Sequence, residues 1–532
     1  MLELTSFIGQ IPRIEDRNLP DMAATVASNA RMNSGGLKAF RGLTTRHAFS
    51  ENVQSFTIWN DTPFGFPEPN VSAVPGPIAE DRLYLTGQAA GPQMFYQGTY
   101  YSMGVPKPGT APTLTLIPAA DPGSENQALE QSLLYAYSWV TDLGEESAMS
   151  LLAGPILVTP GEQVQIDGFE APPANRRVTN MRIYRSVTSA SGITDLYFLV
   201  ELPAATISHT DTDTTTALTG VAPNLDFDQP PTTMDGLIAM PNGMMVAFDG
   251  REILFCEPYL PHAWPRKYSL FTNDDIVGLA AFGSTVAVMT TGTPYIVQGL
   301  HPDSMAMEKT EQEYPCVSRA GIVDMGYAAA YPSNDGLVMV SGQGAQLVTQ
   351  DIFTREQWRG LNPDTFNASR IEQRYAFAHL PDGAADVRIG LIDLRGDLGF
   401  YAEIAIPSLE LRFDVATSNM LSLGEDQRTI SIVDDPNAAR LTFTWRSKPV
   451  DFPSLRTFGA VRAKGRAAVG GDDSVTIRVY ADGALLHTTS GLNRIHRLPQ
   501  KRAAEWQIEL EGQANITNLA MAVTPEDLAR AG

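Results

Sequence analysis

Apolar and polar residues alternate with period two along most of the chain, in short runs that end at turn residues. Residues 475–479 (VTIRV), 506–510 (WQIEL), 181–184 and 196–200 follow this pattern. Such alternation is typical of a strand with one buried face. Asn-Gly or Asp-Gly pairs separate many of the runs and favour tight hairpins, because these residues tolerate positive φ. The pairs lie at 242–243, 249–250, 335–336, 382–383 and 482–483. The pattern predicts an all-β protein.

Two segments instead follow helical spacing. Residues 21–31 (DMAATVASNAR) place Ala23, Ala27 and Ala30 on one face of a helix, and residues 524–531 have a similar pattern. We therefore expect a short helix in an N-terminal arm, residues 1–50, that makes assembly contacts. A second short helix is expected at the C-terminus.

Residues 110–225 predict a β-sandwich of two sheets. The segment follows a Pro-rich run at 105–112, which is typical of a linker. It holds about seven short strands, with Trp139 and Tyr184 as expected core aromatics and a turn at 142–146 (DLGEE). The order of its motifs (Tyr-x-Tyr, then Arg-Ile-Tyr-Arg, then a final Asp-Thr) resembles a fibronectin type III domain.

A loose repeat runs through residues 236–455. Residues 237–255 and 276–297 each read as three strands joined by turns, and a third copy covers 321–348. Weaker copies cover 372–405 and 411–446. A period of about 40–50 residues with three or four strands per repeat is typical of β-propeller blades.

Residues 52–101 can supply a further blade and close the ring with strands that are distant in the chain. We therefore predict a propeller of five or six blades from residues 51–109 and 226–455, with the sandwich inserted between blades. Residues 456–532 predict a small C-terminal β-sandwich closed by the terminal helix.

The charge is strongly acidic and unevenly distributed. The 532 residues carry a net charge of −22. Residues 1–50 contribute +2, residues 51–235 contribute −15, residues 236–455 contribute −11 and residues 456–532 contribute +2. An acidic protein repels phosphate backbones, so a nucleic-acid-coating role is disfavoured.

The sequence favours a protein made in a reducing cytoplasm. Its two cysteines, Cys256 and Cys316, exclude a disulfide framework and are expected as buried core thiols. The first residues carry an acid where a signal peptide needs a base. The longest apolar run, residues 276–290, is interrupted by small residues and is shorter than the roughly 20 residues of a membrane-spanning helix.

Metal and nucleotide chemistry find little support. No two histidines have the three- or four-residue spacing of a helical zinc site, so we interpret all seven as isolated loop or surface residues. Neither a Gly-x-Ser-x-Gly elbow nor a phosphate-binding Gly-x-x-x-x-Gly-Lys loop occurs. No cofactor and no metal are expected. The histidines are His47, His209, His262, His301, His379, His487 and His496.

Paired carboxylates are the remaining catalytic candidates, because glycoside hydrolysis needs two of them at a set separation. The pairs 274–275 and 434–435 are adjacent, so on extended strands their side chains point to opposite faces. Sialidase-type Asp boxes are absent from the sequence. Asp211 and Asp213 could ligate calcium, but they lack the glycine and distal glutamate of a loop site, which favours a plain acidic turn.

Two further features suggest interaction surfaces. The loop at 257–265 (EPYLPHAWP) combines aromatic residues with proline, which suits either a docking surface or a plug between blades. Basic residues near the C-terminus suggest contacts with neighbouring subunits, with a solvated face as the alternative. They are Arg462, Lys464, Arg466, Arg478, Arg494, Arg497, Lys501 and Arg502.

Three stretches of the chain carry motifs of one known protein family. The first is residues 7–41, which open with FIGQIPR and close with GGLKAFR. The second combines residues 81–87 (DRLYLTG) with residues 100–108 (YYSMGVPKP). The third is residues 479–512, with VYADG, RLP and WQIELEG in order. Together these stretches resemble the tail nozzle (tail tube or hub) proteins of short-tailed bacteriophages.

The resemblance implies a non-enzymatic virion protein that forms a homo-oligomeric ring, typically a hexamer, below the portal and adaptor rings. Its expected partners are copies of itself, the head-to-tail adaptor and tail fibre or spike proteins. Genomic DNA would pass through the bore without sequence-specific binding, and an acidic lumen suits this because it repels phosphate. The alternative is a propeller that binds or hydrolyses carbohydrate.

Overall fold

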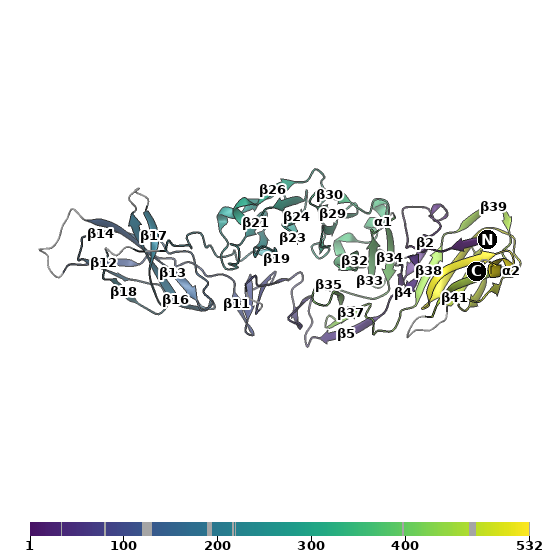
Figure 1. Cartoon of the computed structure of the whole chain (residues 1–532), viewed down its shortest axis with the longest axis horizontal. Coiled ribbons are helices and arrows are strands. Elements are labelled where there is room, and N and C mark those ends of the chain that lie inside the picture. The colour runs from purple at the N-terminus through teal and green to yellow at the C-terminus, as the bar shows by residue number, and fades with distance from the viewer. Residues whose placement is uncertain are drawn as a thin grey trace. The chain divides into compact units, whose positions relative to one another are not determined.

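The chain forms two compact units, each built of sheets whose strands pair mainly antiparallel (Figure 1). The computed structural model describes all residues except 33–34, 79–80, 120–129, 189–193, 215–217, 219, 396–397, 468–474 and 531–532. Unit 1 comprises Met1–Asn70, Ala287–Ile296 and Glu308–Gly532, and unit 2 comprises Val71–Val286 and Val297–Met307. The predicted fold class is confirmed: the protein is all-β, with propeller-type blades, an inserted sandwich and a C-terminal sandwich.

Unit 2 contains two four-stranded sheets of blade form. Each is a meander in which neighbouring strands in the chain pair antiparallel. The first comprises β8 (Ser72–Pro75), β9 (Arg82–Thr86), β10 (Gln93–Tyr96) and β11 (Thr99–Ser102). The second comprises β19 (Asp235–Ala239), β20 (Met245–Asp249), β21 (Glu252–Phe255) and β22 (Leu270–Phe271). One buried cluster joins the two sheets and includes Tyr84, Met94, Leu237 and Met245.

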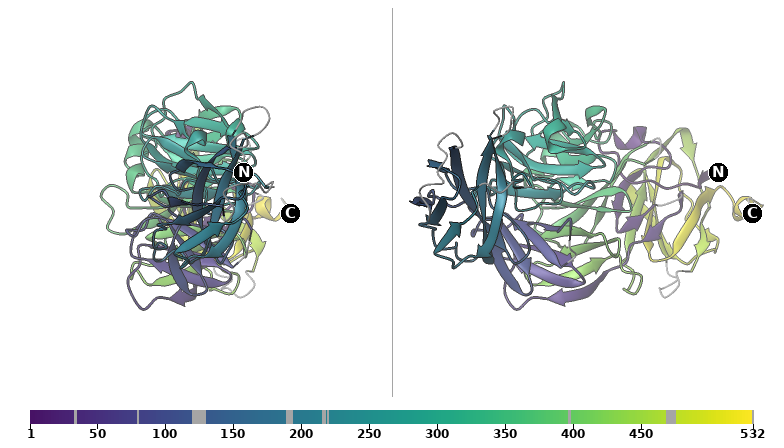
Figure 2. Two further views of the ribbon diagram at one scale, coloured as in Figure 1. Left: turned by 90° about the vertical axis from the view of Figure 1, so that its left-hand side faces the viewer. Right: turned by 60° about the vertical axis from the view of Figure 1, so that its left-hand side comes forward.

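The inserted sandwich has seven strands in two sheets, as the sequence predicted (Figure 2). The three-stranded sheet comprises β12 (Thr113–Ile117), β15 (Gln163–Asp167) and β18 (Ser208–Asp211). The four-stranded sheet comprises β14 (Ala153–Val158), β13 (Gln131–Thr141), β16 (Val178–Thr188) and β17 (Thr194–Pro203). Trp139 lies in the core with Val164 and Ile166 of the opposite sheet. Tyr184 is buried too, but it packs with Ala136, Met149 and Ala222 in a separate cluster.

Unit 1 contains further blade-type sheets. One comprises β27 (Val323–Asp324), β28 (Ala329–Pro332), β29 (Leu337–Ser341) and β30 (Gly344–Leu347), and the next comprises β31 (Asn367–Ile371), β32 (Arg374–His379), β33 (Arg388–Asp393) and β34 (Phe400–Ile404). The third joins β35 (Glu410–Asp414), β36 (Asn419–Leu423) and β37 (Thr429–Val433) to the chain-distant β5 (Leu43–Ala48). A further four-stranded sheet, which is not confined to the residue ranges of unit 1, comprises β23 (Ile276–Phe282), β24 (Thr285–Thr290), β25 (Tyr295–Gln298) and β26 (Ala306–Lys309).

The described residues therefore hold six four-stranded sets of blade form, where the sequence predicted five or six blades. The prediction that residues 52–101 form one blade is wrong in detail. Only β8–β11 form a four-stranded sheet, and the preceding strands β6 (Ser55–Trp59) and β7 (Thr62–Phe66) form a separate hairpin. Pairing of β5 with β37 nevertheless matches the expected use of chain-distant strands.

The C-terminal segment folds together with the N-terminal one. One sheet runs β1 (Leu2–Leu4), β45 (Asn515–Ala522), β40 (Ala460–Arg466) and β43 (His496–Arg497). The blade β31–β34 continues through β2 (Ala24–Ser28) into β38 (Phe443–Ser447), β44 (Ala503–Gly512), β41 (Val475–Ala481) and β42 (Ala484–Ser490), and β39 (Val450–Arg456) also pairs with β44. A small pair joins β3 (Ala30–Arg31) to β4 (Lys38–Ala39).

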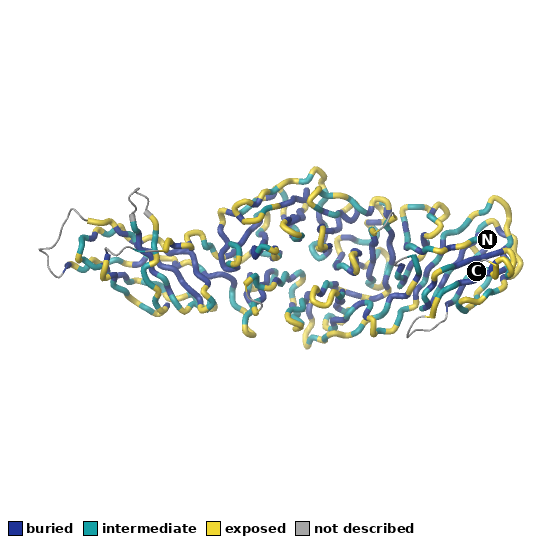
Figure 3. The backbone as a smooth tube through the Cα atoms, viewed as in Figure 1, coloured by how far each residue is buried: buried dark blue, intermediate teal, exposed yellow. Residues whose placement is uncertain are grey.

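Helices are short. The described ones are α1 (Arg355–Arg359), the expected C-terminal α2 (Pro525–Arg530) and the 3-10 turns Asp16–Asn18, Arg266–Tyr268, Pro302–Ser304 and Pro363–Thr365. Buried residues concentrate along the strands, and exposed residues concentrate at the turns (Figure 3).

The predicted helix at residues 21–31 is wrong, because the segment forms β2 and β3. Ala24 and Ala27 are buried, and β2 pairs antiparallel with β38. Helical spacing of small residues is a weak signal, and pairing with a sheet overrides it here. The small side chains let β2 sit between two other strands.

Candidate functional site

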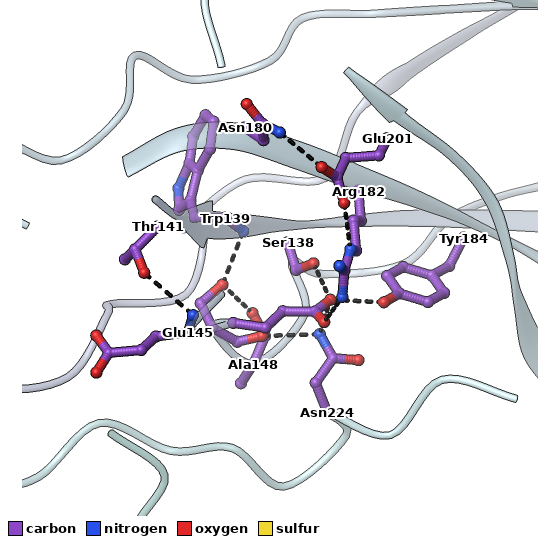
Figure 4. Close-up of polar contacts among 12 residues, drawn as sticks. Ser138, Trp139, Thr141, Glu145, Ala148, Asn180, Arg182, Tyr184, Glu201 and Asn224 are labelled. Carbon is purple, nitrogen blue, oxygen red and sulfur yellow. Dashed lines mark hydrogen bonds and ion pairs between the residues drawn. The ribbon is translucent and has the colours of Figure 1, made fainter. Parts of the chain in front are cut away.

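A buried polar cluster in unit 2 surrounds the carboxylate of Glu146, which binds the side chains of Ser138, Arg182, Tyr184 and Asn224 that are labelled in Figure 4. Its Oε1 accepts hydrogen bonds from the hydroxyls of Ser138 (2.6 Å) and Tyr184 (2.5 Å). The amide of Asn224 donates to the same oxygen at 2.9 Å, and Arg182 donates to Oε2 at 2.7 Å. Ser138, Arg182 and Tyr184 lie on β13 and β16, on the face of the four-stranded sheet opposite Trp139.

A second carboxylate extends this cluster towards the surface. Glu201 accepts hydrogen bonds from Arg182 at 2.8 Å and from Asn180 at 2.6 Å. Burial acts to lower the pKa of Arg182, but its bonds to Glu201 and the charge of Glu146 outweigh this effect and raise it. Burial and then the charge of Glu146 raise the pKa of Tyr184. The guanidinium and the phenol are therefore held as donors.

The neighbouring Glu145 faces the blade β8–β11 rather than the sandwich. It is 8% exposed, and its Oε1 lies 3.7 Å from Nη1 of Arg82 on β9. Burial raises the pKa of Glu145 to about 7, although Arg82 acts to lower it. Leu143, two residues before Glu145, packs against the core cluster shared by the two unit 2 blades.

His262 contacts the same turn from the loop at 257–265. Its Nε2 accepts a hydrogen bond from the backbone N–H of Glu146 at 3.3 Å, so the imidazole is neutral. Burial, followed by the charge of Arg82, lowers the pKa of His262 to about 4. Its ring also makes an edge-to-face contact with Phe227 at 5.9 Å between centroids.

Two arginines beside the 142–146 turn complete the contact with the blade. Arg176 donates to the carbonyl oxygens of Met103 (2.6 Å) and Gly104 (2.8 Å). Arg177 forms an ion pair with Asp142 and donates to the hydroxyl of Tyr101 on β11. Within unit 2, the sandwich is thus fixed to the blade by paired polar groups. We call the contacts of residues 142–146 and 176–177 with the blade and the 257–265 loop the sandwich–blade joint.

The chemistry of the joint is structural. Four donors already occupy the acceptor positions of the Glu146 carboxylate, whose side chain is 5% exposed. Three of these donors bind Oε1 and one binds Oε2, and a substrate that displaced them would leave buried donors without partners. The geometry therefore fits positioning of the sandwich better than acid–base catalysis.

The predicted calcium candidate has another role. Asp211 ends β18 and is buried, and its carboxylate accepts hydrogen bonds from Tyr135 (2.9 Å) and Arg185 (2.7 Å). The carbonyl oxygen of Asp213 accepts from the same arginine. The plain acidic turn favoured from sequence is therefore wrong for Asp211, which anchors a buried ion pair within the sandwich.

The two adjacent acid pairs also have distinct partners. Asp275 forms an ion pair with Arg251, and the carbonyl of Asp274 accepts from Thr272. Asp434 is not on an extended strand as assumed, since its φ is 58°. It forms an ion pair with Arg31, whereas Asp435 accepts from the backbone of Asn437.

The histidine prediction needs a partial correction. His262 and His379 are buried, whereas the other five are at least partly exposed. Burial lowers the pKa of His379 to about 4, and its Nδ1 lies 3.2 Å from the carbonyl oxygen of Leu361. In the described ranges, no three His, Cys, Asp or Glu side chains gather as a metal site would need.

Both cysteines, Cys256 and Cys316, are buried free thiols, as predicted. Burial raises the pKa of each thiol to about 12, so neither ionises readily. Searching the described helices reveals none with the length and apolar character needed to cross a bilayer.

The loop at 257–265 was expected to be either a docking surface or a plug between blades, and its two parts differ. Trp264 is buried in the cluster between the two unit 2 blades, and its indole N–H donates to the carbonyl of Pro261. This residue is a plug. Tyr259 is 52% exposed and has a φ of 63°, so the tip of the loop remains open to solvent.

The C-terminal basic residues also divide. Arg478 pairs with Glu509 and Glu511 on the neighbouring strand, and Arg462 is buried. The exposed members are Arg466, Arg494, Arg497, Lys501 and Arg502.

Sequence reasoning missed the joint because residues 142–146 read as an ordinary acidic turn. Gly144 does adopt a turn conformation, with a φ of 77°. The available signal was the sequence after the turn, where Ser147, Ala148, Met149 and Ser150 are small or apolar. A solvated acidic turn rarely continues into such a segment, and all four residues are buried.

Comparisons with known proteins give weak likenesses only. No family model matches the sequence, and the search of curated proteins gives no match. Three solved structures are similar in part: BBS1N in complex with ARL6DN, the WD40 domain of Neurospora crassa Pan2, and the N-terminal domain of Nup159. Their identities to this chain are 11%, 8% and 9%, with TM-scores of 0.28, 0.29 and 0.23. They cover 74%, 70% and 62% of this chain, and 98%, 91% and 86% of their own. The description of the fold rests on the strand pairing given above.

Proposed function

We propose that this chain is a structural subunit of the tail nozzle of a short-tailed bacteriophage. Copies of it would form a ring of about sixfold symmetry below the portal and adaptor. The bore of the ring would retain the genomic DNA and pass it during ejection. Adaptor and fibre or spike proteins would be its neighbours, and the subunit would assemble in the host cytoplasm before joining the virion.

The observation that carries the proposal is where the three family-like stretches lie in the fold. In the first, Phe7 is buried and meets Trp445 edge-to-face, with 5.0 Å between ring centroids. A Cβ at Gly9 would lie 2.3 Å from the carbonyl oxygen of Tyr401, so glycine is required at this close approach. The second stretch contains β9 and most of β11, and the third contains the end of β41 and the whole of β44. All three thus belong to the framework, which a family of assembly subunits is expected to share.

The charge distribution supports the same function. Residues 51–235 carry −15 of the net −22. Acidic surfaces repel the DNA backbone, which favours sliding over adhesion in a bore. The buried carboxylates described above bind internal donors, so they act as structural anchors.

The carbohydrate alternative gains no comparable support. It requires two carboxylates that converge on one sugar. Asp434 and Asp435 bind different partners, as do Asp274 and Asp275. We therefore keep glycan cleavage as an outcome to be tested.

Electron microscopy of the purified full chain tests the proposal directly. Negative-stain images should show closed rings, and a labelled antibody against the chain should bind at the tail of particles that contain it. A monomer at all concentrations, together with cleavage of a glycan panel, would overturn the proposal.

Charge reversal at the exposed C-terminal cations adds a second test. Arg494→Glu combined with Lys501→Glu and Arg502→Glu should weaken ring formation, because these cations would face acidic surfaces of the next copy. Arg17→Glu is the control, because its side chain is 66% exposed and lies outside this group. Equal assembly of both variants by mass photometry would rule out this surface as the contact.

A further inference from the structure

Unit 1 contains a group of buried and partly buried arginines whose charge the nearby carboxylates do not balance. The group comprises four arginines, Arg31, Arg41, Arg374 and Arg440, which we call the arginine cluster. Asp434 lies among them: it forms an ion pair with Arg31, and its Oδ1 accepts from the backbone N–H of Arg41 at 2.7 Å. Its side chain is 7% exposed.

One more carboxylate lies at the rim. Glu372 forms ion pairs with Arg31 and with Arg374, whose Nη2 is 3.0 Å away. Arg374 is 2% exposed and also contacts Asp393 at 3.0 Å, but Asp393 is shared with Arg395. Counting that shared pair as neutral, four cations face the two acids Asp434 and Glu372. The cluster therefore carries an excess of about two positive charges.

Two of the arginines lack a carboxylate partner. Arg41 donates from its side chain to the carbonyl of Ala438, and Arg440 donates to the amide oxygen of Asn515 at 3.4 Å. Neither guanidinium forms an ion pair with Asp or Glu within the part of the chain that is described. The Nε–H of Arg440 is buried without a hydrogen-bond partner.

The backbone places these two like charges side by side. Arg41 and Arg440 are directly opposed in an antiparallel bridge. Like charges in directly opposed positions destabilise a sheet. Burial and then the charge of Arg41 lower the pKa of Arg440, and the charge of Asp434 offsets them only in part. The chain has 60 acidic and 38 basic residues, yet four arginines lie close together at this place.

We propose that the arginine cluster is a binding site for a multivalent oxyanion of the phosphate class, held chiefly by Arg41 and Arg440. A dianion matches the charge excess of the cluster. Guanidinium groups bind phosphate oxygens through paired, charge-assisted hydrogen bonds, which a chloride ion cannot reproduce. The bound anion would supply the partner that neither arginine finds within the chain. The inference does not depend on the nozzle proposal.

The test measures binding of inorganic phosphate to the purified full chain. Isothermal titration gives the affinity, and thermal unfolding in sodium phosphate is compared with sodium chloride at equal ionic strength. Phosphate should raise Tm above the chloride value, because a ligand that binds only the native state stabilises it. Equal Tm values in the two salts, with no heat of binding, would overturn the proposal.

Three variants identify the site. Arg440→Gln should weaken phosphate binding about tenfold, the effect of losing one charged hydrogen-bond pair. Asp434→Asn should tighten binding several-fold, because it removes the carboxylate that competes for the same cations. Arg17→Gln should bind as the unaltered chain does, since this exposed arginine pairs with Glu15 and lies outside the arginine cluster. Unchanged binding by Arg440→Gln would overturn the assignment.

Arg440→Gln is expected to weaken phosphate binding and Asp434→Asn to tighten it. A variant that simply unfolds cannot bind more tightly, so the second variant separates loss of the site from loss of the fold. If the circular dichroism spectrum shows that Arg440→Gln is unfolded, phosphate binding by Asp434→Asn becomes the deciding measurement. Weaker or unchanged binding by that variant contradicts the proposal. A single-stranded oligonucleotide provides the last arm. If the oligonucleotide binds, Arg440→Gln abolishes that binding, and free phosphate does not bind, then the site binds the nucleic-acid backbone. The proposal of a small oxyanion is then wrong.

Discussion

The sandwich–blade joint and the arginine cluster differ in how fully the chain satisfies their charge. At the joint, Glu146 receives four hydrogen bonds from side chains of the sandwich and its following linker. In the cluster, Arg41 and Arg440 oppose one another, and Arg440 retains a buried N–H without a partner. The comparison assigns a structural role to the carboxylate with complete internal partners, and it marks the incompletely paired arginines as the place to test for a ligand.

The largest expected effect is at Glu146. Glu146→Ala strands the donors of Ser138, Tyr184 and Asn224 in a buried place, and it should lower the free energy of unfolding of unit 2 by about 3–5 kcal/mol. Glu201→Gln is the matched control. It alters a half-exposed partner of the same arginine and should cost at most about 1 kcal/mol. Urea denaturation measures both, and equal small losses would show that the joint does not hold the sandwich.

The pH dependence of the joint sharpens the comparison. The pKa of Glu145 is raised to about 7 from 4.5, so the native state disfavours its charge. Its destabilising contribution is absent below about pH 4.5, develops as pH rises and is complete above pH 7. Glu145→Gln should therefore leave stability unchanged at pH 4.5 and raise it by about 3 kcal/mol at pH 8.

His262 gives the opposite trend, which supplies the control. Its pKa is lowered to about 4, so it contributes stability that is present above pH 6.5 and lost as pH falls towards 4. Between pH 4.5 and 6.5, rising pH lowers the free energy of unfolding through Glu145 and raises it through His262. In Glu145→Gln, only the rise due to His262 should remain. Urea midpoints at the two pH values test this, and a pH-independent gain in the variant would refute it.

The smallest expected effect on stability is at Arg440, and it distinguishes this arginine from Arg374 of the same cluster. In phosphate-free buffer, Arg440→Gln should change the free energy of unfolding by only about 0.5 kcal/mol, in the stabilising direction, because it relieves repulsion from Arg41. Arg374→Gln is the contrast. It breaks the buried pairs with Glu372 and Asp393 and should destabilise by about 3 kcal/mol. A large loss from Arg440→Gln would mean that its charge is already satisfied within the chain.

Local patterns predicted much of the fold. Asp249-Gly250 and Asp482-Gly483 form hairpin turns, as expected, and the seven sandwich strands follow the period-two pattern. Alternation is a local property, so a single sequence reveals it. Pairing between distant segments is not local. Nothing near β2 indicates that it pairs with β38, more than 400 residues away in the chain, and the alanine spacing there suggested a helix.

Both charged sites depend on such distant pairing, which explains why neither was predicted. The joint brings Glu146 to His262, and the cluster brings Arg41 to Arg440. Each residue alone resembles an ordinary turn or surface residue. The family-like stretches do contain Arg41, yet the resemblance carries no information about its opposition to Arg440.

Hydrogen exchange with and without phosphate tests the contrast most directly. Phosphate should slow amide exchange in unit 1 peptides that cover residues 29–41, 371–375 and 434–441, since binding there suppresses local opening. Peptides that cover residues 142–146 and 176–177 of the joint should exchange at the same rate in phosphate and in chloride. Equal protection of both regions, or protection of the joint alone, would contradict the account.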